Sequence, residues 1–272
     1  MALKINTNIP SLRSDREISK KTAALNKNFE SLASGKRINR ASDDPAGLSI
    51  ALALQTSASV SDVARRNIND AVSASNIAEG AISTASDISA RLSELASQAS
   101  NGVLSDEQRE SLNSEFNALR SELDRISQTT EFNGQQLLGG SANFVVQAGT
   151  DGSSNSQISV PFPSVSAAGL GLSSNLSSQA SARQALDETR AAVDRLAQSR
   201  GDIGATVSRL EVANENLRAS SVNERDAASQ ILDADIAEQA AQLTANRIGQ
   251  QAAVAVKAQA NLTSQLALRL LS

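Results

Sequence analysis

The sequence predicts a mainly α-helical protein: a long antiparallel coiled-coil-like helical bundle with one small β-hairpin region and with helical termini that are paired in the assembled form. Apolar residues recur at alternating spacings of four and three over roughly 130 residues before position 131 and roughly 95 after position 171. The stretch between lacks this repeat and holds two short β-like runs. Aromatic residues are only 2% of the chain, so the helices must pack closely around a thin core.

Composition excludes several classes of function. Lys and Arg number 25 and Asp and Glu 29, so the net charge is 25 − 29 = −4 with both signs interspersed, which argues against nucleic-acid binding. Cysteine and histidine are both absent, which excludes disulfides, the common zinc sites and Ser-His or Cys-His nucleophiles. We therefore expect no enzyme activity, no metal and no cofactor. No apolar run approaches the roughly 18 residues of a membrane span, and residues 1–6 do not resemble a cleaved signal peptide.

The first helix carries an apolar stripe that nothing nearby in the sequence can cover. After one phase shift, its spacing continues at four and three to about residue 32. A buried helix of a compact domain would explain the stripe, but pairing with the other terminus or with another molecule is favoured. The apolar residues of this stripe are Ile5, Ile9, Leu12, Ile18, Leu25, Phe29 and Leu32, with Thr22 completing the spacing.

Residues 34–45 form a linker between two helical blocks. Gly35 breaks the first pattern, and Asp44 and Pro45 suit the N-cap and first position of the next helix. The adjacent pair Asp43 and Asp44 could be a catalytic carboxylate pair, but capping is far commoner at a helix start.

The next helix is predicted from Pro45 to about Ser100, with Gly102 as its C′ residue. At 1.5 Å per residue it is roughly 80 Å long. Its small residues allow close approach of partner helices. Its repeat comprises Ile50, Leu54, Ser57, Ser61, Ala64, Ile68, Ala71, Ser75, Ala78, Ile82, Ala85, Ser89, Leu92, Ala96 and Ala99.

Two further helices complete the predicted bundle. Ser105 and Gln108 form a capping box, and the helix that follows presents Leu112, Phe116, Leu119, Leu123 and Ile126 on one face. The short link implies an antiparallel neighbour. A third repeat runs through Ala182, Leu186, Thr189, Val193, Leu196, Ile203, Val207, Leu210 and Leu217.

The chain closes with an apolar helical block from about residue 229. An end this apolar needs a partner, because free termini fray in water. The repeat consists of Ala241, Ala245, Ile248, Ala252, Ala255, Leu262 and Leu266, and Leu270 follows it.

The β-like runs predict a hairpin. Phe144, Val145 and Val146 form one run, and Ile158, Val160 and Phe162 form the other, across residues 148–156. We expect two domains: 1–40 with 229–272 as a terminal helical pair, and 45–228 as a bundle with the hairpin at about 140–175.

Several motifs resemble those of one family, the bacterial flagellins, over nearly the whole length. At the N-terminal side these motifs are residues 5–12, 32–39 and 43–51, and residues 130–138 mark the change from helix to β structure. At the C-terminal side they are residues 200–205, 209–211 and 231–237. Two departures are Thr263, where many relatives carry proline, and Lys257 in a stretch that is usually apolar.

The resemblance implies a structural subunit that self-assembles into the flagellar filament for swimming motility. The terminal pair (D0) would lie at the filament core and the bundle (D1) around it, and the missing outer domains imply a thin, smooth filament. Implied partners are other copies of the chain, hook-filament junction proteins, the filament cap, the flagellar type III export apparatus and a C-terminal export chaperone. The implied location is the secreted, extracellular filament. Alternatives are a hook-filament junction protein and a soluble coiled-coil adaptor.

Two further sets of residues are expected on the bundle surface. The charged faces of the long helix should meet neighbouring subunits, with Arg65 and Arg66 as the test residues. The resemblance also implies recognition by Toll-like receptor 5 at Arg91, Leu95 and Glu115. The alternative is that Leu95 belongs to the core and that the two charges are merely solvated.

Overall fold

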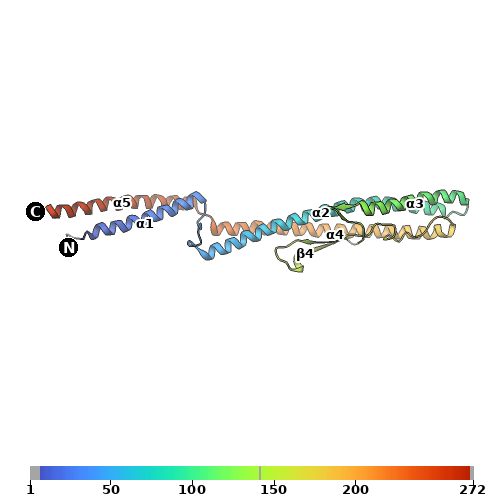
Figure 1. Ribbon diagram of the computed structural model, residues 1–272, viewed down its shortest axis with the longest axis horizontal. Coiled ribbons are helices and arrows are strands. Elements are labelled where there is room, and N and C mark those ends of the chain that lie inside the picture. Colours follow the sequence, from blue (N-terminus) through green and yellow to red (C-terminus); the bar gives the residue numbers. More distant parts are fainter. Residues whose placement is uncertain (1–6, 141, 270–272) are drawn as a thin grey trace. The chain divides into compact units, whose positions relative to one another are not determined.

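The computed structural model describes residues 7–140 and 142–269, and most of them are helical. The helices are α1 (Ile9–Ser34), α2 (Pro45–Ala99), α3 (Asp106–Thr129), α4 (Gln179–Leu232) and α5 (Ile236–Arg269), with a 3₁₀ turn, η1 (Ser154–Ser156). The strands are β1 (Glu131–Phe132), β2 (Gln135–Gln136), β3 (Asn143–Gln147) and β4 (Gln157–Pro161). This arrangement confirms the predicted mainly α fold with a small hairpin region (Figure 1). None of the helices in the described ranges is both long and apolar enough to cross a membrane.

The chain divides into two compact units. Unit 1 comprises Met1–Thr56 and Asn223–Ser272, so that it joins segments from both ends of the sequence. Unit 2 comprises Ser57–Val222.

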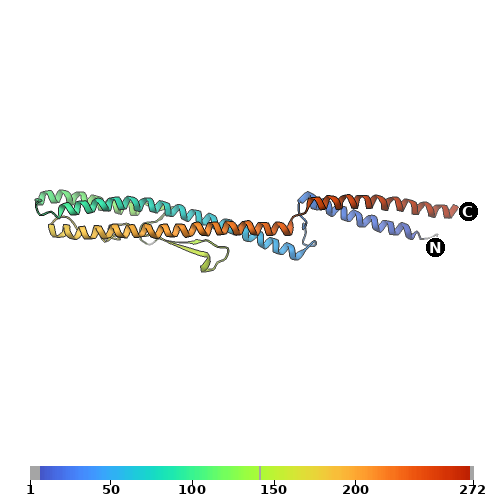
Figure 2. The ribbon, with the colours of Figure 1, turned by 180° about the vertical axis from the view of Figure 1, so that it is seen from behind.

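Unit 2 is built around an apolar core that its three helices share. From Ser61 to Ala99, the predicted repeat of α2 faces this core, including Ile68, Ile82 and Leu92, whose side chains have no exposed surface. Phe116 and Leu123 of α3 and Leu196 and Leu210 of α4 pack into the same cluster. The three helices lie side by side in opposite views (Figures 1 and 2). The spacing of four and three therefore identified the inner face of each helix.

The hairpin forms as predicted and covers part of this core. β3 and β4 pair antiparallel, with Phe144 opposite Val160 and Val146 opposite Ile158. Val146 and Val160 are buried, and the ring of Phe144 meets that of Phe162 edge-on at 5.3 Å. The irregular segment after β4 also enters the core, which the helical pattern did not predict. Its buried residues are Phe162, Val165, Ala167, Leu170, Leu172 and Leu176.

Capping residues set three helix ends where they were expected, whereas the last helix begins at Ile236 rather than at about 229, because α4 continues to Leu232. Asp44 Oδ1 accepts a hydrogen bond from Gly47 N at 2.9 Å, at the start of α2. The capping box of Ser105 and Gln108 is complete at the start of α3. Gly35 ends α1 in the left-handed region at φ 69°, where glycine is strongly favoured. These contacts satisfy backbone groups that a helix end otherwise leaves unpaired.

The end of α2 differs from the prediction, because Gly102 has no left-handed φ and does not act as a C′ residue. The buried guanidinium of Arg109 satisfies the carbonyls there instead. It donates to Ala99 O at 2.7 Å, to Asn101 O at 3.2 Å and to Leu104 O at 2.8 Å. A side chain from the next helix thus closes the turn between α2 and α3.

Unit 1 holds the antiparallel pair α1 and α5 and a small core at their base. Ile38, Ala51 and Leu232 are buried together there. Backbone hydrogen bonds tie the linker after α1 to the end of α4 and to the connection that follows it: Arg37 N donates to Leu232 O at 2.6 Å, and Ala234 N donates to Gly35 O at 2.9 Å. The pairing of the two termini is thus present within one chain.

Candidate assembly surface

The contact between α1 and α5 is largely polar. Asn8 Nδ2 donates to Ala260 O at 3.0 Å, and Gln250 Nε2 donates to Thr22 Oγ1 at 2.8 Å. Lys257, the unexpected charge in an apolar stretch, faces α1 and pairs with Asp15. The two helices therefore meet through hydrogen bonds and small side chains more than through apolar packing.

The apolar repeat predicted for α5 lies on its outer face, directed away from α1. Ile248 is 61% exposed and Leu262 is 52% exposed. The side chains of Ala241, Ala245, Ala252 and Ala255 are exposed as well. The residues that face α1 form a second repeat of fours and threes: Gln239, Leu243, Asn246, Gln250, Ala253, Lys257 and Ala260. We call the first set the outer repeat and the second the inner repeat.

The two repeats are offset by two residues, and at 100° per residue they lie about 160° apart around the helix. α5 consequently presents a mixed polar and small-residue face to α1 and an apolar face to its surroundings. Large apolar side chains left in water at this spacing are typical of a surface that another protein covers.

The predicted stripe of α1 is divided between these two environments. Leu25 is buried, and Ile18 and Leu32 are half-buried against α5. Ile9, Leu12 and Phe29 are exposed, Phe29 by 57%. Ile5 and Leu270 lie outside the described residues, as does the side chain of Leu266, whose backbone belongs to α5.

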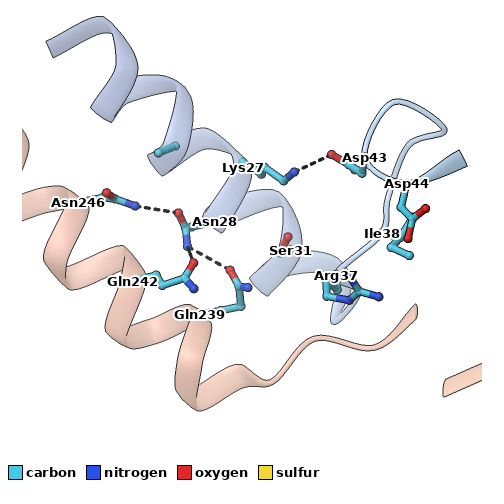
Figure 3. Close-up of a pocket in the computed structure, with 11 residues that line it drawn as sticks. Lys27, Asn28, Ser31, Arg37, Ile38, Asp43, Asp44, Gln239, Gln242 and Asn246 are labelled. Atoms are coloured by element: carbon cyan, nitrogen blue, oxygen red, sulfur yellow. Dashed lines mark hydrogen bonds and ion pairs between the residues drawn. The ribbon is translucent and has the colours of Figure 1, made fainter. Parts of the chain in front are cut away.

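A cavity of about 260 Å³ lies at the base of the pair, between α1, the linker and α5 (Figure 3). Asn28 is 5% exposed and points from α1 into a group of α5 amides. Its Nδ2 donates to Gln239 Oε1 at 3.0 Å and to Gln242 Oε1 at 3.4 Å, and its Oδ1 accepts from Asn246 Nδ2 at 3.2 Å. We call Asn28, Gln239, Gln242 and Asn246 the amide cluster.

Asp43 holds the linker beside this cavity. Its carboxylate accepts from Lys27 Nζ at 2.8 Å and from the backbone N–H groups of Asn39 and Arg40. The Lys27 contact and these backbone hydrogen bonds lower the pKa of Asp43. Asp44 caps α2, so the two adjacent carboxylates have separate structural roles.

Arg65 and Arg66, the predicted charged contacts, lie in different surroundings. Arg65 Nε donates to Asn214 Oδ1 of α4 at 3.0 Å, and its guanidinium is 3.6 Å from Asp62. Its charge therefore helps to join two helices of unit 2. Arg66 is exposed, so a neighbouring molecule could reach it directly.

The three residues of the predicted receptor surface also lie in different surroundings. Arg91 bridges Glu94 and Glu115, with nitrogen–oxygen distances of 2.9 Å to each. The contact with Glu115, which has the larger effect, and the contact with Glu94 both raise the pKa of Arg91. Leu95 is 1% exposed and belongs to the core. Arg91 and Glu115 thus lie at the surface, while Leu95 lies beneath it.

Sequence reasoning missed the amide cluster. It placed Phe29 on the inner stripe of α1, whereas Asn28 occupies the inner position and Phe29 is exposed. A signal was present in α5, where Gln239, Gln242 and Asn246 follow the i, i+3, i+7 spacing of one helix face. Polar residues at that spacing indicate an inward polar face only if the facing helix carries a matching amide.

Family comparison matches both halves of the chain. Residues 5–143 match the description "Bacterial flagellin N-terminal helical region", and residues 186–271 match "Bacterial flagellin C-terminal helical region". These ranges contain both α1 and α5.

Individual proteins match over nearly full length. A protein named "Flagellin" from Halalkalibacterium halodurans is 34% identical over 269 residues, covering 98% of this chain and 99% of the relative. The "Flagellar filament 31.3 kDa core protein" of Treponema maltophilum is 32% identical over 283 residues, covering 98% of this chain and 99% of the relative. The crystal structure of Bacillus cereus flagellin superposes with a TM-score of 0.50 at 26% identity, covering 56% of this chain and 88% of that one.

Proposed function

We propose that this chain, which belongs to the bacterial flagellin family, is the repeating structural subunit of an extracellular flagellar filament used for swimming. The matches at both ends and over nearly the full length support this function. No catalytic role is proposed. Self-assembly is a function that needs extended, repeated contact surfaces rather than an enclosed pocket.

The observation that carries the proposal is the apolar outer repeat of α5. Fully burying a large aliphatic side chain contributes about 1.5 to 3 kcal/mol, and a single chain leaves Ile248 and Leu262 more than half exposed, so a large part of that contribution is missing. Unit 1 exposes three further large apolar side chains, those of Ile9, Leu12 and Phe29. A polymer can bury these residues in every subunit, so a modest gain per residue is multiplied along its length.

Filament growth by purified chain provides the test. The variant combining Ile248→Ala and Leu262→Ala should fail to polymerise, or do so much more slowly, with unit 2 still folded. Val103→Ala is a matched control, since Val103 is an exposed aliphatic residue of unit 2. Sedimentation measures polymer and thermal unfolding measures the fold. Normal polymerisation of the double variant, or no polymer from the parent chain under any condition, would contradict the proposal.

A hook-filament junction protein is the second candidate, because the resemblance implies similar ends. The near full-length match to proteins named flagellin and flagellar filament core protein favours the filament subunit. Stoichiometry separates the two functions: a filament subunit dominates sheared flagella, whereas a junction protein is a trace component.

The domain roles and the wider partners are also proposals. We assign residues 1–40 with 229–272 to the D0-like pair and residues 45–228 to the D1-like bundle. Export would use the flagellar type III apparatus and a C-terminal chaperone, and assembly would involve the cap and junction proteins. Family resemblance supports these assignments.

Recognition by Toll-like receptor 5 is proposed through the exposed pair Arg91 and Glu115, with Leu95 supporting them from the core. Monomeric protein applied to receptor-bearing cells should give a response that Arg91→Ala weakens. No response to the parent protein would contradict this proposal.

A further inference from the structure

α5 could face α1 in two ways, and the structure contains only one of them. The outer repeat, with Ile248 and Leu262, is the more apolar of its two faces, yet it points away from α1. Apolar burial alone would favour the opposite orientation, because α1 offers Ile18, Leu25 and Leu32 on its inner face. A specific interaction must therefore hold the inner repeat of α5 against α1.

The amide cluster is the interaction with the required properties. Among the described side chains of α1, Asn28 is buried and bonded to three residues of α5 through both of its amide atoms. The Thr22–Gln250 and Asp15–Lys257 contacts involve more exposed groups, and exposed polar pairs discriminate weakly between arrangements. A single buried asparagine is known to fix alignment in coiled coils because leaving its amide unpaired is unfavourable.

A rotation of α5 would remove every partner of Asn28. Turning the helix by about 160° would place the outer repeat against α1, where Ala237, Ala240 and Thr244 would take the places of Gln239, Gln242 and Asn246. The buried amide would then lose all three amide partners, and the one polar side chain to replace them would be Thr244, whose hydroxyl already donates to Ala240 O. Asn28 thus opposes the arrangement that would bury the apolar face within a single chain.

We propose that Asn28 is a positioning residue that sets the rotational orientation of α5, so that the apolar outer repeat remains available to neighbouring copies of the chain. The orientation itself is a property of unit 1, whereas its consequence for polymerisation rests on the proposed function. Asn28→Leu would add a fourth aliphatic side chain to Ile18, Leu25 and Leu32 on the inner face of α1, and this face would then suit the apolar face of α5.

Introduced cysteine pairs can report the orientation, because the chain has no cysteine of its own. Thr22→Cys with Gln250→Cys reports the observed orientation, since these two side chains are in contact. Thr22→Cys with Ile248→Cys reports the rotated one. A short bifunctional thiol reagent links either pair, and yields are measured on free chain and on sedimented polymer. Asn26→Leu is the matched control, as Asn26 is an exposed asparagine of the same helix.

In the parent sequence the 22–250 link should exceed the 22–248 link by about tenfold or more, as expected when a buried amide would lose its partners. Asn28→Leu should lower this ratio several-fold and reduce the polymer yield, while Asn26→Leu should change neither. An unchanged ratio in Asn28→Leu, or equal links in the parent, would overturn the proposal. A parent chain that forms no polymer would contradict the proposed function instead, and the ratio on free chain would still decide the role of Asn28.

Discussion

The two units use their apolar residues in opposite ways. In unit 2 the large side chains of α2, α3 and α4 point inward and are covered by the hairpin and the segment after it. In unit 1 the helices α1 and α5 meet through polar groups, and several of their large apolar side chains are in water. Unit 2 can therefore be stabilised by its own core, whereas the proposed function has neighbouring copies of the chain complete the burial of unit 1.

The largest expected effect comes from opening the core of unit 2. Phe116 is 1% exposed at the centre of the bundle, so Phe116→Ala should lower the free energy of unfolding of unit 2 by about 3 to 5 kcal/mol. Phe29→Ala removes the same ring from an exposed position in unit 1 and serves as the control. Chemical denaturation of both variants measures the difference. Equal losses would show that the two regions do not differ as described.

A smaller effect is expected from reversing the charges of Arg65 and Arg66 one at a time. Arg65→Glu should lower the melting temperature of unit 2, because it breaks the Asn214 contact between α2 and α4. Arg66→Glu should leave the melting temperature unchanged and slow polymerisation, since exposed charges influence association rate more than stability. Thermal unfolding and seeded growth, measured on each single variant, test this division. The opposite assignment of the two effects would place Arg66 in the bundle contact.

The smallest effect concerns acid stability near the start of α4. Burial alone would raise the pKa of Glu188, but hydrogen bonds from the backbone and hydroxyl groups of Ser174 and Ser173 outweigh it and lower the pKa. A lowered folded-state pKa stabilises the protein above the ordinary glutamate value, and this contribution is lost as the pH falls through the folded-state pKa.

Glu188→Gln should therefore destabilise unit 2 slightly at neutral pH, with a difference from the parent that shrinks below about pH 4. Asp187→Asn, at a neighbouring position in the same helix, provides the control. Denaturation midpoints across a pH series measure the effect. A difference that grows on acidification would contradict the assigned direction.

Much of the fold followed from the sequence because helical periodicity reports burial directly. The repeat of α2 located its inner face from Ser61 to Ala99, and the β-like runs located the hairpin. Ile50 was the exception: it is 55% exposed, and the adjacent Ala51 is buried in its place. The buried segment holding Val165 to Leu176 and the turn closed by Arg109 depend on contacts distant in sequence, which a local pattern does not encode.

The candidate surface was predicted only in part, for a related reason. Spacing identified Ile248 and Leu262 as members of one stripe, but a stripe does not specify whether the partner belongs to the same chain. α5 carries two repeats with the same spacing, and the choice between them depends on which α1 residues they meet. That choice became visible only with Asn28 and its three amide partners in place.

Hydrogen exchange of the free chain and of the polymer tests the central claim most directly. In the free chain, amides of α1 up to Leu32 and of α5 from Ile248 onward should exchange rapidly, because uncovered helices open at little cost, whereas α2 amides near Ile82 should exchange slowly. In the polymer the α1 and α5 amides should become protected and those near Ile82 should change little. If α1 and α5 are already as protected in the free chain as the core of unit 2, the claim that neighbouring copies complete unit 1 is wrong.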